Sequence, residues 1–543
     1  MRRSSSLPAV VAGLCLLLPV LAYSQVDTAW VRLYRYIPTA WSGATDLAVD
    51  TAGNVYVTGI SCGSTGVEDY ATIKYNPAGD TLWVRRYDGT ANVEDEAYAL
   101  ALDRVGHVYV TGGSADSANY WDCVTIKYSP TGETRWVARY DGPGHDDDWA
   151  NDVAIGESGS VFATGTSVTT EFDYDIATIK YNSTGEEQWV SRHGGALGIE
   201  DEANAIAVDD SGNVYVTGVE DRGSRPDTDS KLVTIKYGPT GDTLWVSRHD
   251  GGGTGRDEGR DIMVDAAHNV YVTGGHWDTL GACVTIKYGP GGETLWVRTY
   301  SGNYPYLDQY GSALALDGAG NVYVGGACAV DGNFNDFLTI KYGPDGQRLW
   351  ARTYNGPTGY SSDWVNDIAL DGAGSVYVTG MSEQVHPYGE DDYATIKYDA
   401  DGNEEWLALY NHPSNGDDQA YAVAVDNSSH VYVAGISGDE SYATIKYTQA
   451  GGVEEAPSAE RRTSNVGPTV VRRTLTMEDR GRKTGDRAEL LDAAGRKVLD
   501  LKPGANDVSH LAPGVYFLMS QPTSNSPRSG TDAANDARVV IVK

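Results

Sequence analysis

Cysteine is scarce in this chain, with 5 residues among 543. Cys15 lies in an apolar N-terminal run, and the others are Cys62, Cys123, Cys283 and Cys328. No two of them have CxxC spacing, which argues against a zinc site or a thioredoxin-like redox site. Two arrangements fit their positions: disulfides between neighbouring units (Cys62 with Cys123, or Cys283 with Cys328), or buried free thiols.

Basic residues and known catalytic motifs are also few. The chain has 41 Lys and Arg against 75 Asp and Glu, a net charge of -34, and nearly all of the acidic excess precedes Val453. Such a surface repels phosphate backbones and anionic lipid heads, so we expect no nucleic-acid partner and no binding to membrane surfaces. Because His-Glu-x-x-His and P-loop motifs are missing, no catalytic residue can be named.

Long apolar runs are absent after the first 25 residues, so no transmembrane segment is expected. Arg2 and Arg3 precede an apolar run over Leu7–Ala22, which ends in a small-x-small cleavage pattern. We interpret residues 1–25 as a signal peptide. The mature protein is therefore expected to be secreted or to lie on the outer-membrane surface.

Repetition is what the chain has in abundance. One Trp recurs at intervals of 51 to 56 residues, at positions 30, 83, 136, 189, 245, 296, 350 and 406. Each unit holds four β-branched, aromatic or alternating runs of strand length, as in residues 82–87, 97–103, 108–111 and 124–128. Four strands at this period are typical of a β-propeller blade. The Ala-rich runs suit the crowded axis, and the Trp runs suit the rim.

The two ends of the repeat are out of phase. The run Ala29–Tyr36 has the Trp but lacks three strands, whereas residues 421–447 supply three strands without a Trp. We therefore predict an all-β fold: an eight-bladed β-propeller over residues 26–449, closed by its N-terminal strand. Closure removes exposed sheet edges that would favour aggregation.

Two resemblances refine this domain organisation. The run Asp201–Gly218, which recurs in each unit, resembles the bacterial β-propeller repeat family, and this implies the fold but not an activity. Residues Ala488–Val498, Leu511–Phe517 and Arg538–Lys543 are similar to the C-terminal sorting domain of type IX secretion substrates. That resemblance implies a small β-sandwich over residues 469–543 that engages the type IX export machinery, although the polar insert 522–537 departs from it. Residues 450–468 are predicted to be a linker.

Connection lengths predict which face of the propeller carries function. Connections between the second and third strands vary in length, while the turns on the opposite face are constant, and variable loops usually carry function. Five additional tryptophans and several other aromatics fall in the variable connections. Exposed aromatics there suit stacking on sugars or gripping a protein, whereas the alternative is that they only pack the loops together. The candidate ligand-binding residues are Trp41, Trp121, Trp149, Trp277, Trp364, Tyr120 and Tyr360.

Acidic residues recur on the same strands. One Asp marks the entry to the inner strand at positions 95, 148, 201, 257, 363 and 418, and a second set alternates with Ala four residues later: Asp46, Asp152, Asp261 and Asp367. A pseudo-fourfold array of carboxylates could hold calcium. The alternative is that each Asp caps neighbouring backbone N–H groups. The repeated Lys of the Ile-Lys-Tyr runs is expected to pair with a carboxylate.

These patterns favour an exported, non-enzymatic binding module that presents an aromatic and acidic loop face to a polysaccharide or a protein. No cofactor is assigned with confidence. One alternative is a quinoprotein-like dehydrogenase, whose docking turns are similar to Gly79–Trp83, but the chain lacks a vicinal cysteine pair. Another is a structural surface-layer protein.

Overall fold

The computed structural model describes most of residues 26–449 and seven strands between residues 469 and 542. Short gaps in the first part are residues 38–39, 64, 91, 157, 171–172, 195–200, 222–229, 253–254, 278–280, 304–308, 331–333, 357–361, 384–389, 415 and 439. The predicted signal peptide and linker lie outside the described residues. The chain divides into two units, Met1–Gly452 and Val453–Lys543.

The described residues form strands and turns without a helix, so the all-β prediction is confirmed. Consequently they include no apolar helix of membrane-spanning length. Three four-stranded antiparallel sheets begin the first unit. They are β2 (Ser42–Val49), β3 (Val55–Cys62), β4 (Glu68–Tyr75) and β5 (Thr81–Tyr87); β6 (Asp95–Leu102), β7 (Val108–Ala115), β8 (Trp121–Tyr128) and β9 (Thr134–Tyr140); and β10 (Asp148–Ile155), β11 (Val161–Thr170), β12 (Asp173–Tyr181) and β13 (Glu187–His193).

The same strand order continues through the rest of this unit. The strands are β14 (Glu202–Val208), β15 (Val214–Asp221), β16 (Ser230–Tyr237) and β17 (Thr243–His249); β18 (Arg256–Val264), β19 (Val270–Trp277), β20 (Ala282–Tyr288) and β21 (Thr294–Tyr300); β22 (Tyr310–Leu316), β23 (Val322–Cys328), β24 (Asp336–Tyr342) and β25 (Arg348–Tyr354); and β26 (Asp363–Leu370), β27 (Val376–Glu383), β28 (Asp391–Tyr398) and β29 (Glu404–Tyr410). A single pair, Gly275 with Tyr310, joins β18–β21 to β22–β25.

The last sheet combines the two ends of the repeat. Strands β30 (Gln419–Val425), β31 (Val431–Ser437) and β32 (Ser441–Gln449) pair in order, and β1 (Val26–Tyr34) pairs antiparallel with β32. In this register Trp30 lies opposite Lys446. The equivalent pair within a continuous sheet is Trp83 with Lys74.

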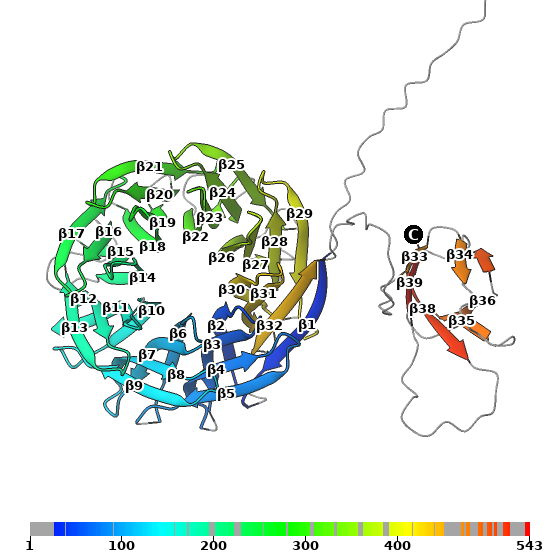
Figure 1. Ribbon diagram of the computed structural model, residues 1–543, viewed down its shortest axis with the longest axis horizontal. Coiled ribbons are helices and arrows are strands. Elements are labelled where there is room, and N and C mark those ends of the chain that lie inside the picture. The colour runs from blue at the N-terminus through cyan, green and yellow to red at the C-terminus, as the bar shows by residue number, and fades with distance from the viewer. Residues whose placement is uncertain are drawn as a thin grey trace, which may run out of the picture. The chain divides into compact units, whose positions relative to one another are not determined.

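Side-chain size matches position in the ring of sheets. Figure 1 shows β2, β6, β10, β14, β18, β22, β26 and β30 toward its centre, with the Trp-bearing strands around its outside. The inner strands are rich in Ala, as in Ala203, Ala205 and Ala207 of β14. The second strands are buried along their whole length, which explains why they have continuous rather than alternating apolar residues.

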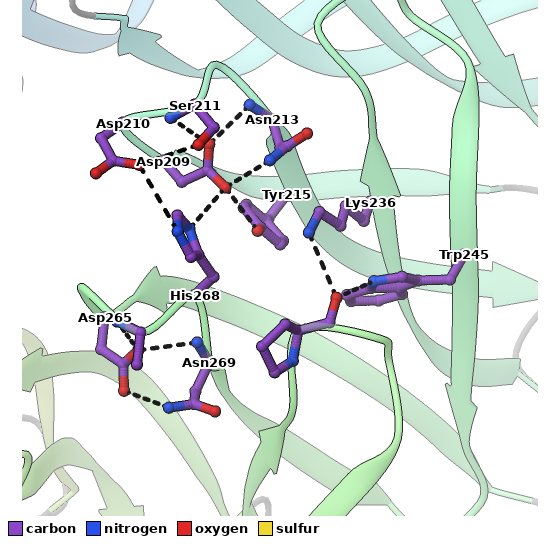
Figure 2. A network of polar contacts seen from close by, with 12 residues as sticks. Asp209, Asp210, Ser211, Asn213, Tyr215, Lys236, Trp245, Asp265, His268 and Asn269 are labelled. Carbon is purple, nitrogen blue, oxygen red and sulfur yellow. Dashed lines mark hydrogen bonds and ion pairs between the residues drawn. The ribbon is translucent and has the colours of Figure 1, made fainter.

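A Trp packs each sheet against the next. The Trp245 ring lies between Tyr215 of its own sheet and Tyr288 of the next, with ring centroids 6.2 and 6.1 Å away. Its Nε1 donates to the Pro290 carbonyl at 3.1 Å, in the next sheet (Figure 2). Gly292 follows at φ 86°, and a Cβ there would lie 2.7 Å from Trp245. Trp245 therefore packs its own sheet against the next.

Trp406 departs from this pattern. Its Nε1 is buried and makes no hydrogen bond, although its ring packs on Tyr447 with centroids 6.2 Å apart. In the other sheets the acceptor is a turn between the third and outer strands, as at Pro290. Strands β32 and β1 are not joined by such a turn, so this carbonyl is lacking where the two ends of the repeat meet.

An Asx turn connects the first two strands of most sheets. Asp209 accepts the N–H groups of Ser211 at 3.0 Å and Asn213 at 2.8 Å, and the Tyr215 hydroxyl at 2.9 Å (Figure 2). Such local bonds favour a turn over continued strand. The Asp and Tyr recur six residues apart at 50 and 56, 103 and 109, 265 and 271, 317 and 323, 371 and 377, and 426 and 432.

The third sheet has lost both members of this pair together. Gly156 stands at the Asp position and Phe162 at the Tyr position. This joint loss is physically consistent, because a buried Tyr hydroxyl without its acceptor would carry a desolvation cost. Cavities of about 420 and 270 Å³ border this turn, and Gly156 lines both of them.

We expect the pair to act as a unit when it is restored. Gly156→Asp together with Phe162→Tyr should raise the free energy of unfolding by about 1 kcal/mol more than the two single changes added together. Phe162→Tyr alone should destabilise the protein, because its hydroxyl gains no carboxylate. Denaturant unfolding of the four proteins measures this coupling, and strictly additive effects would contradict it.

The four described cysteines are free and buried. Burial raises the pKa of the Cys283 thiol to about 12. The neighbouring-unit disulfides are therefore not formed, and the free-thiol alternative describes these residues.

The second unit contains a mixed sheet with the strand order β33 (Thr469–Val471), β39 (Arg538–Val542), β38 (Gly514–Gln521), β35 (Arg487–Leu491) and β36 (Lys497–Leu501). Strands β33 and β39 are parallel, and the other neighbours are antiparallel. A two-stranded sheet pairs β34 (Thr474–Met477) with β37 (Gly504–Asp507).

Candidate functional site

The first unit has two faces, which differ in their connections. We call the end that carries the β3–β4 and β5–β6 connections, and their equivalents, the variable-loop face. The opposite end, with the β2–β3 and β4–β5 turns, is the short-turn face. The candidate aromatic residues belong to the variable-loop face.

The structure places the candidate tryptophans at strand ends. Trp121 is the first residue of β8, Trp149 and Trp364 are the second residues of β10 and β26, and Trp41 directly precedes β2. All four are partly buried, whereas Tyr120 is 44% exposed. The side chain of Trp277 and all of Tyr360 lie outside the described residues.

Trp121 and Trp149 are brought together over Gly113. A Cβ on Gly113 would lie 2.5 Å from the Trp121 ring and 3.5 Å from the Trp149 Cβ. The Trp149 ring also contacts Tyr174 of β12, with centroids 6.2 Å apart. We call Trp121, Trp149 and Tyr174 the aromatic cluster. Glycine is needed at position 113 because any larger side chain would displace the indole.

Trp41 lies elsewhere on the same face. A Cβ on Gly43 would lie 3.1 Å from the Trp41 ring and 2.5 Å from Ile436. Trp41 therefore packs beside the first and last sheets rather than in the aromatic cluster. The sequence placed these tryptophans in connections, whereas Trp121, Trp149 and Trp364 lie at the ends of strands, and only the packing separates Trp41 from the aromatic cluster.

Polar and aromatic residues occupy the same register position as Trp149 on other inner strands, and apart from Trp149 and Trp364 the sequence analysis missed them. This position directly follows the recurring buried residue at the entry to the inner strand and, except for Gly43 in β2, carries an acidic, amide or aromatic side chain. Asn151 Nδ2 donates to Glu202 Oε1 at 3.1 Å, and Asn204 Nδ2 donates to Glu258 Oε1 at 2.9 Å. The set is Glu96, Trp149, Glu202, Glu258, Tyr310, Trp364 and Gln419. An alignment of the inner strands on the recurring buried Asp could have revealed this set of residues.

Glu68 and Glu96 form a carboxyl pair beside this set. Burial, a hydrogen bond with Glu96 and the charge of Glu94 raise the pKa of Glu68 to about 7. The Tyr98 hydroxyl donates to Glu96 Oε2 at 2.8 Å. The pair can hold one proton near neutral pH, which reduces the local negative charge.

The Asp at the entry to the inner strand is buried and supports the connection before it. Asp148 accepts the Gly142 N–H at 2.5 Å and the Val168 N–H at 3.1 Å, while Asp418 accepts those of His412 and Gly438, both at 2.8 Å. Burial raises the pKa of Asp148 to about 6. These hydrogen bonds hold the backbone of the connections on the variable-loop face.

The predicted metal residues are engaged with backbone. Asp152 Oδ1 accepts the Val153 N–H at 2.7 Å, and its Oδ2 accepts the Ile206 N–H of the next sheet at 2.9 Å. Asp46, Asp261 and Asp367 accept the equivalent pairs of N–H groups. The calcium role of Asp46, Asp152, Asp261 and Asp367 stays a prediction, and their observed contacts are those of a link between sheets.

The repeated lysines require a correction. Lys236 Nζ lies 5.0 Å from the centre of the Tyr215 ring and 3.4 Å from the Pro290 carbonyl that also accepts from Trp245 (Figure 2). Lys74 has the same partners, the Tyr56 ring and the Pro130 carbonyl. For Lys74 and Lys236 the tyrosine ring and a carbonyl of the next sheet replace the expected carboxylate partner. Lys397 pairs as expected, with its Nζ 2.7 Å from Glu405 Oε2.

A network on the short-turn face also brings carboxylates and a histidine together. His268 Nδ1 lies 3.0 Å from Asp209 Oδ2 and its Nε2 lies 3.8 Å from Asp210 Oδ1 (Figure 2). Asp209 Oδ2 already accepts hydrogen bonds from Asn213 Nδ2 and from the Tyr215 hydroxyl. This network therefore joins two neighbouring turns and leaves Asp209 little capacity for a ligand.

Comparison with known proteins identifies the repeat. Residues 188–219, from β13 into β15, match the family model described as beta-propeller repeat. An uncharacterized WD repeat-containing protein of Acanthamoeba polyphaga mimivirus is 23% identical over 459 residues. The match covers 68% of this chain and 31% of that protein, so the chain spans about a third of the length of this curated relative.

Two solved structures match this chain at low sequence identity. One is a quinohemoprotein alcohol dehydrogenase from Pseudomonas putida, with 12% identity, a TM-score of 0.44 and coverage of 82% of this chain and 80% of that chain. The other is a protein of unknown function from Bacteroides caccae, with 15% identity, a TM-score of 0.31 and coverage of 56% and 93%.

Proposed function

We propose that this β-propeller repeat protein is an exported binding module that holds a neutral polysaccharide against the aromatic cluster on its variable-loop face. The observation that supports this most is the meeting of Trp121 and Trp149 over Gly113. Two indoles and a tyrosine on one face offer apolar stacking surface with polar edges.

The surrounding polar groups suit hydroxyl-rich ligands. Glu202 and Asn151 lie next to the aromatic cluster along the inner strands, and carboxylates accept hydrogen bonds from hydroxyls. The acidic surface disfavours anionic polymers. A neutral polysaccharide satisfies both conditions, and a protein ligand is the alternative outcome of the experiment below.

The proposed architecture is an eight-bladed propeller closed by β1. The single pairing of Gly275 with Tyr310 supports a division of β18–β25 into two blades. Contacts between the two ends of the repeat support closure: Trp30 Nε1 and Lys446 Nζ both donate to the Pro77 carbonyl at 3.2 Å, and the Tyr442 hydroxyl donates to the Ala71 carbonyl at 3.1 Å.

The proposed location is the cell surface or the medium. The N-terminal signal pattern and the resemblance of residues 469–543 to a type IX sorting domain support export by that route. In this proposal the second unit engages the export machinery and the propeller carries the binding function.

Substitution in the aromatic cluster tests the binding site. Trp149→Ala should weaken polysaccharide binding by about tenfold or more, because a centrally placed aromatic contributes well over 1 kcal/mol. Trp121→Ala should act in the same direction. Trp41→Ala is the matched control, since this Trp lies outside the cluster. The readout is affinity for neutral glycans on an array and by calorimetry.

Three outcomes would contradict this proposal. Equal glycan affinity in Trp149→Ala and the unchanged protein would remove the aromatic cluster from consideration. Binding to a protein but to no glycan would replace the ligand class. Dye reduction after reconstitution with pyrroloquinoline quinone and calcium would favour the dehydrogenase alternative.

A further inference from the structure

Carboxylates crowd together where the first three sheets meet on the variable-loop face. At the first junction one oxygen from each of three residues lies within 4.8 Å of the others, and the next junction repeats the arrangement. The first group comes from β4, the β5–β6 connection and β6, and the second from β8, the β9–β10 connection and β10. The groups are Asp69, Asp88 and Asp95, and Asp122, Asp141 and Asp148.

Each group carries an excess of negative charge. Arg86 pairs with Asp69 in the first group, and Arg139 pairs with Asp122 in the second. Three ionised carboxylates and one guanidinium leave a net charge of two negative units at each junction when all are charged. A divalent cation would balance that charge, whereas the arginines already present do not.

One buried oxygen of the first group lacks a hydrogen bond. Asp95 is fully buried, and its Oδ2 accepts the Gly89 N–H at 2.6 Å. Its Oδ1 has no hydrogen-bond partner, although the Ser114 hydroxyl lies close enough to lower the pKa of this carboxyl. A Cβ on Gly89 would lie 2.7 Å from Oδ1, so this atom faces the turn that carries Asp88. Leaving such an oxygen buried and unpaired costs about 1 to 3 kcal/mol.

A later junction of the same chain holds a cation of its own. Between β14–β17 and β18–β21, Lys231 stands at the position of Asp69, and Asp250 stands at the position of Asp88. Lys231 Nζ lies 3.2 Å from Asp250 Oδ2. An internal ammonium group thus occupies the place that the first two junctions leave to carboxylates.

We propose that the first junction, with its unpartnered Asp95 Oδ1, binds one Ca²⁺ ion; at the second junction both oxygens of Asp148 accept backbone N–H groups, and His145 lies 2.8 Å from Asp141. Calcium takes oxygen ligands at about 2.3 to 2.6 Å, so ligands on opposite sides of the ion lie about 5 Å apart, which matches the spacing here. Carboxylates can coordinate through both oxygens, and water completes the shell. The ion would tie the third and outer strands of one sheet to the inner strand of the next. This inference does not depend on the ligand of the aromatic cluster.

Calorimetry on the chelator-treated full-length protein tests the proposal. We expect one Ca²⁺ ion per chain, with a dissociation constant of about 10⁻⁴ to 10⁻³ M, and a rise in the melting temperature. Asp88→Asn should remove this ion. Asp88 is exposed, so the change leaves the core intact. Asp141→Asn, at the second junction, and Asp250→Asn are the matched controls, and each should retain the ion.

Two results would overturn the proposal. The first is the absence of both heat and thermal stabilisation at millimolar calcium in the unchanged protein. The second is unchanged stoichiometry in the Asp88→Asn variant, which would place any bound calcium elsewhere in the chain. Circular dichroism of each variant verifies that the sheets are retained.

Discussion

Removal of residues 26–36 should abolish the cooperative unfolding transition of the propeller. This deletion removes β1 and with it the outer strand of the last sheet, so β32 becomes an exposed edge. It also removes Trp30, which packs between Tyr432 of the last sheet and Tyr75 of the first at 6.2 and 6.0 Å. Loss of a buried Trp alone costs about 3 to 5 kcal/mol, a large share of the stability of an ordinary domain.

Thermal and denaturant unfolding followed by far-UV circular dichroism measure this effect. Deletion of residues 453–543 is the control, because it removes the second unit and should leave the transition of the first in place. A synthetic peptide of residues 26–36 should restore the transition to the truncated protein in a concentration-dependent way. An unchanged midpoint after the deletion would show that β1 does not hold the ring together.

The variants Trp30→Ala and Trp83→Ala distinguish the contribution of the Trp30 side chain to stability from that of the pairing of strand β1. Both residues occupy the same repeat position, but only Trp30 belongs to a strand that lacks a covalent turn to its sheet. Similar losses of stability in the two variants would show that packing between sheets acts equally around the ring. A larger loss for Trp30→Ala would identify the meeting of the two ends as the weakest junction.

The strand content could be predicted from the sequence because each rule there is local. The period of about 53 residues, the Ala-rich inner runs and the Trp positions follow from side-chain size and alternation. The N-terminal Trp run without its sheet indicated the pairing of β1 with β32, since strand edges are costly to leave open. The structure describes that pairing with Trp30 opposite Lys446.

The candidate site could be predicted only in part, because it depends on contacts between sheets. The end of the sheets that carries Trp121 and Trp149 was identified, but their positions within β8 and β10 and their meeting over Gly113 were not. Lys74 and Lys236 were given the wrong partner because their contact with a tyrosine ring depends on the register between two strands, whereas Lys397 has the predicted carboxylate partner. The joint change to Gly156 and Phe162 was visible in the sequence, yet its meaning appears only when Asp209 and Tyr215 are seen to bond.

The alternating inner-strand carboxylates should make the free energy of unfolding fall as the pH rises from about 4 to about 7. Burial, together with the charges of Asp46 and Asp261, raises the pKa of both Asp152 and Asp367 to about 7. An Asp in the unfolded chain titrates near pH 4. Between these values the folded state binds protons that the unfolded state has released, so the stability contributed by these groups is complete below about pH 4 and is lost as the pH rises through 7.

The double variant Asp152→Asn, Asp367→Asn isolates this contribution. Relative to the unchanged protein, the free energy of unfolding of this variant should improve between pH 5 and pH 8 by up to about 2.6 kcal/mol for each carboxyl. The amide keeps one acceptor for the backbone of the next sheet but carries no charge. Urea unfolding at each pH measures the difference.

Asp317→Asn is the matched control because its shift has the opposite sign. Hydrogen bonds from Asn321 and from the Tyr323 hydroxyl are among the interactions that lower the pKa of Asp317. Its stabilising contribution is therefore lost only as the pH falls below about 4. The difference in free energy of unfolding between this variant and the unchanged protein should stay constant between pH 5 and pH 8. If the difference in free energy of unfolding is also constant for the Asp152→Asn, Asp367→Asn double variant, then Asp152 and Asp367 ionise in the folded protein with little loss of stability. In that case a bound cation or water at the centre of the ring would have to stabilise their charge.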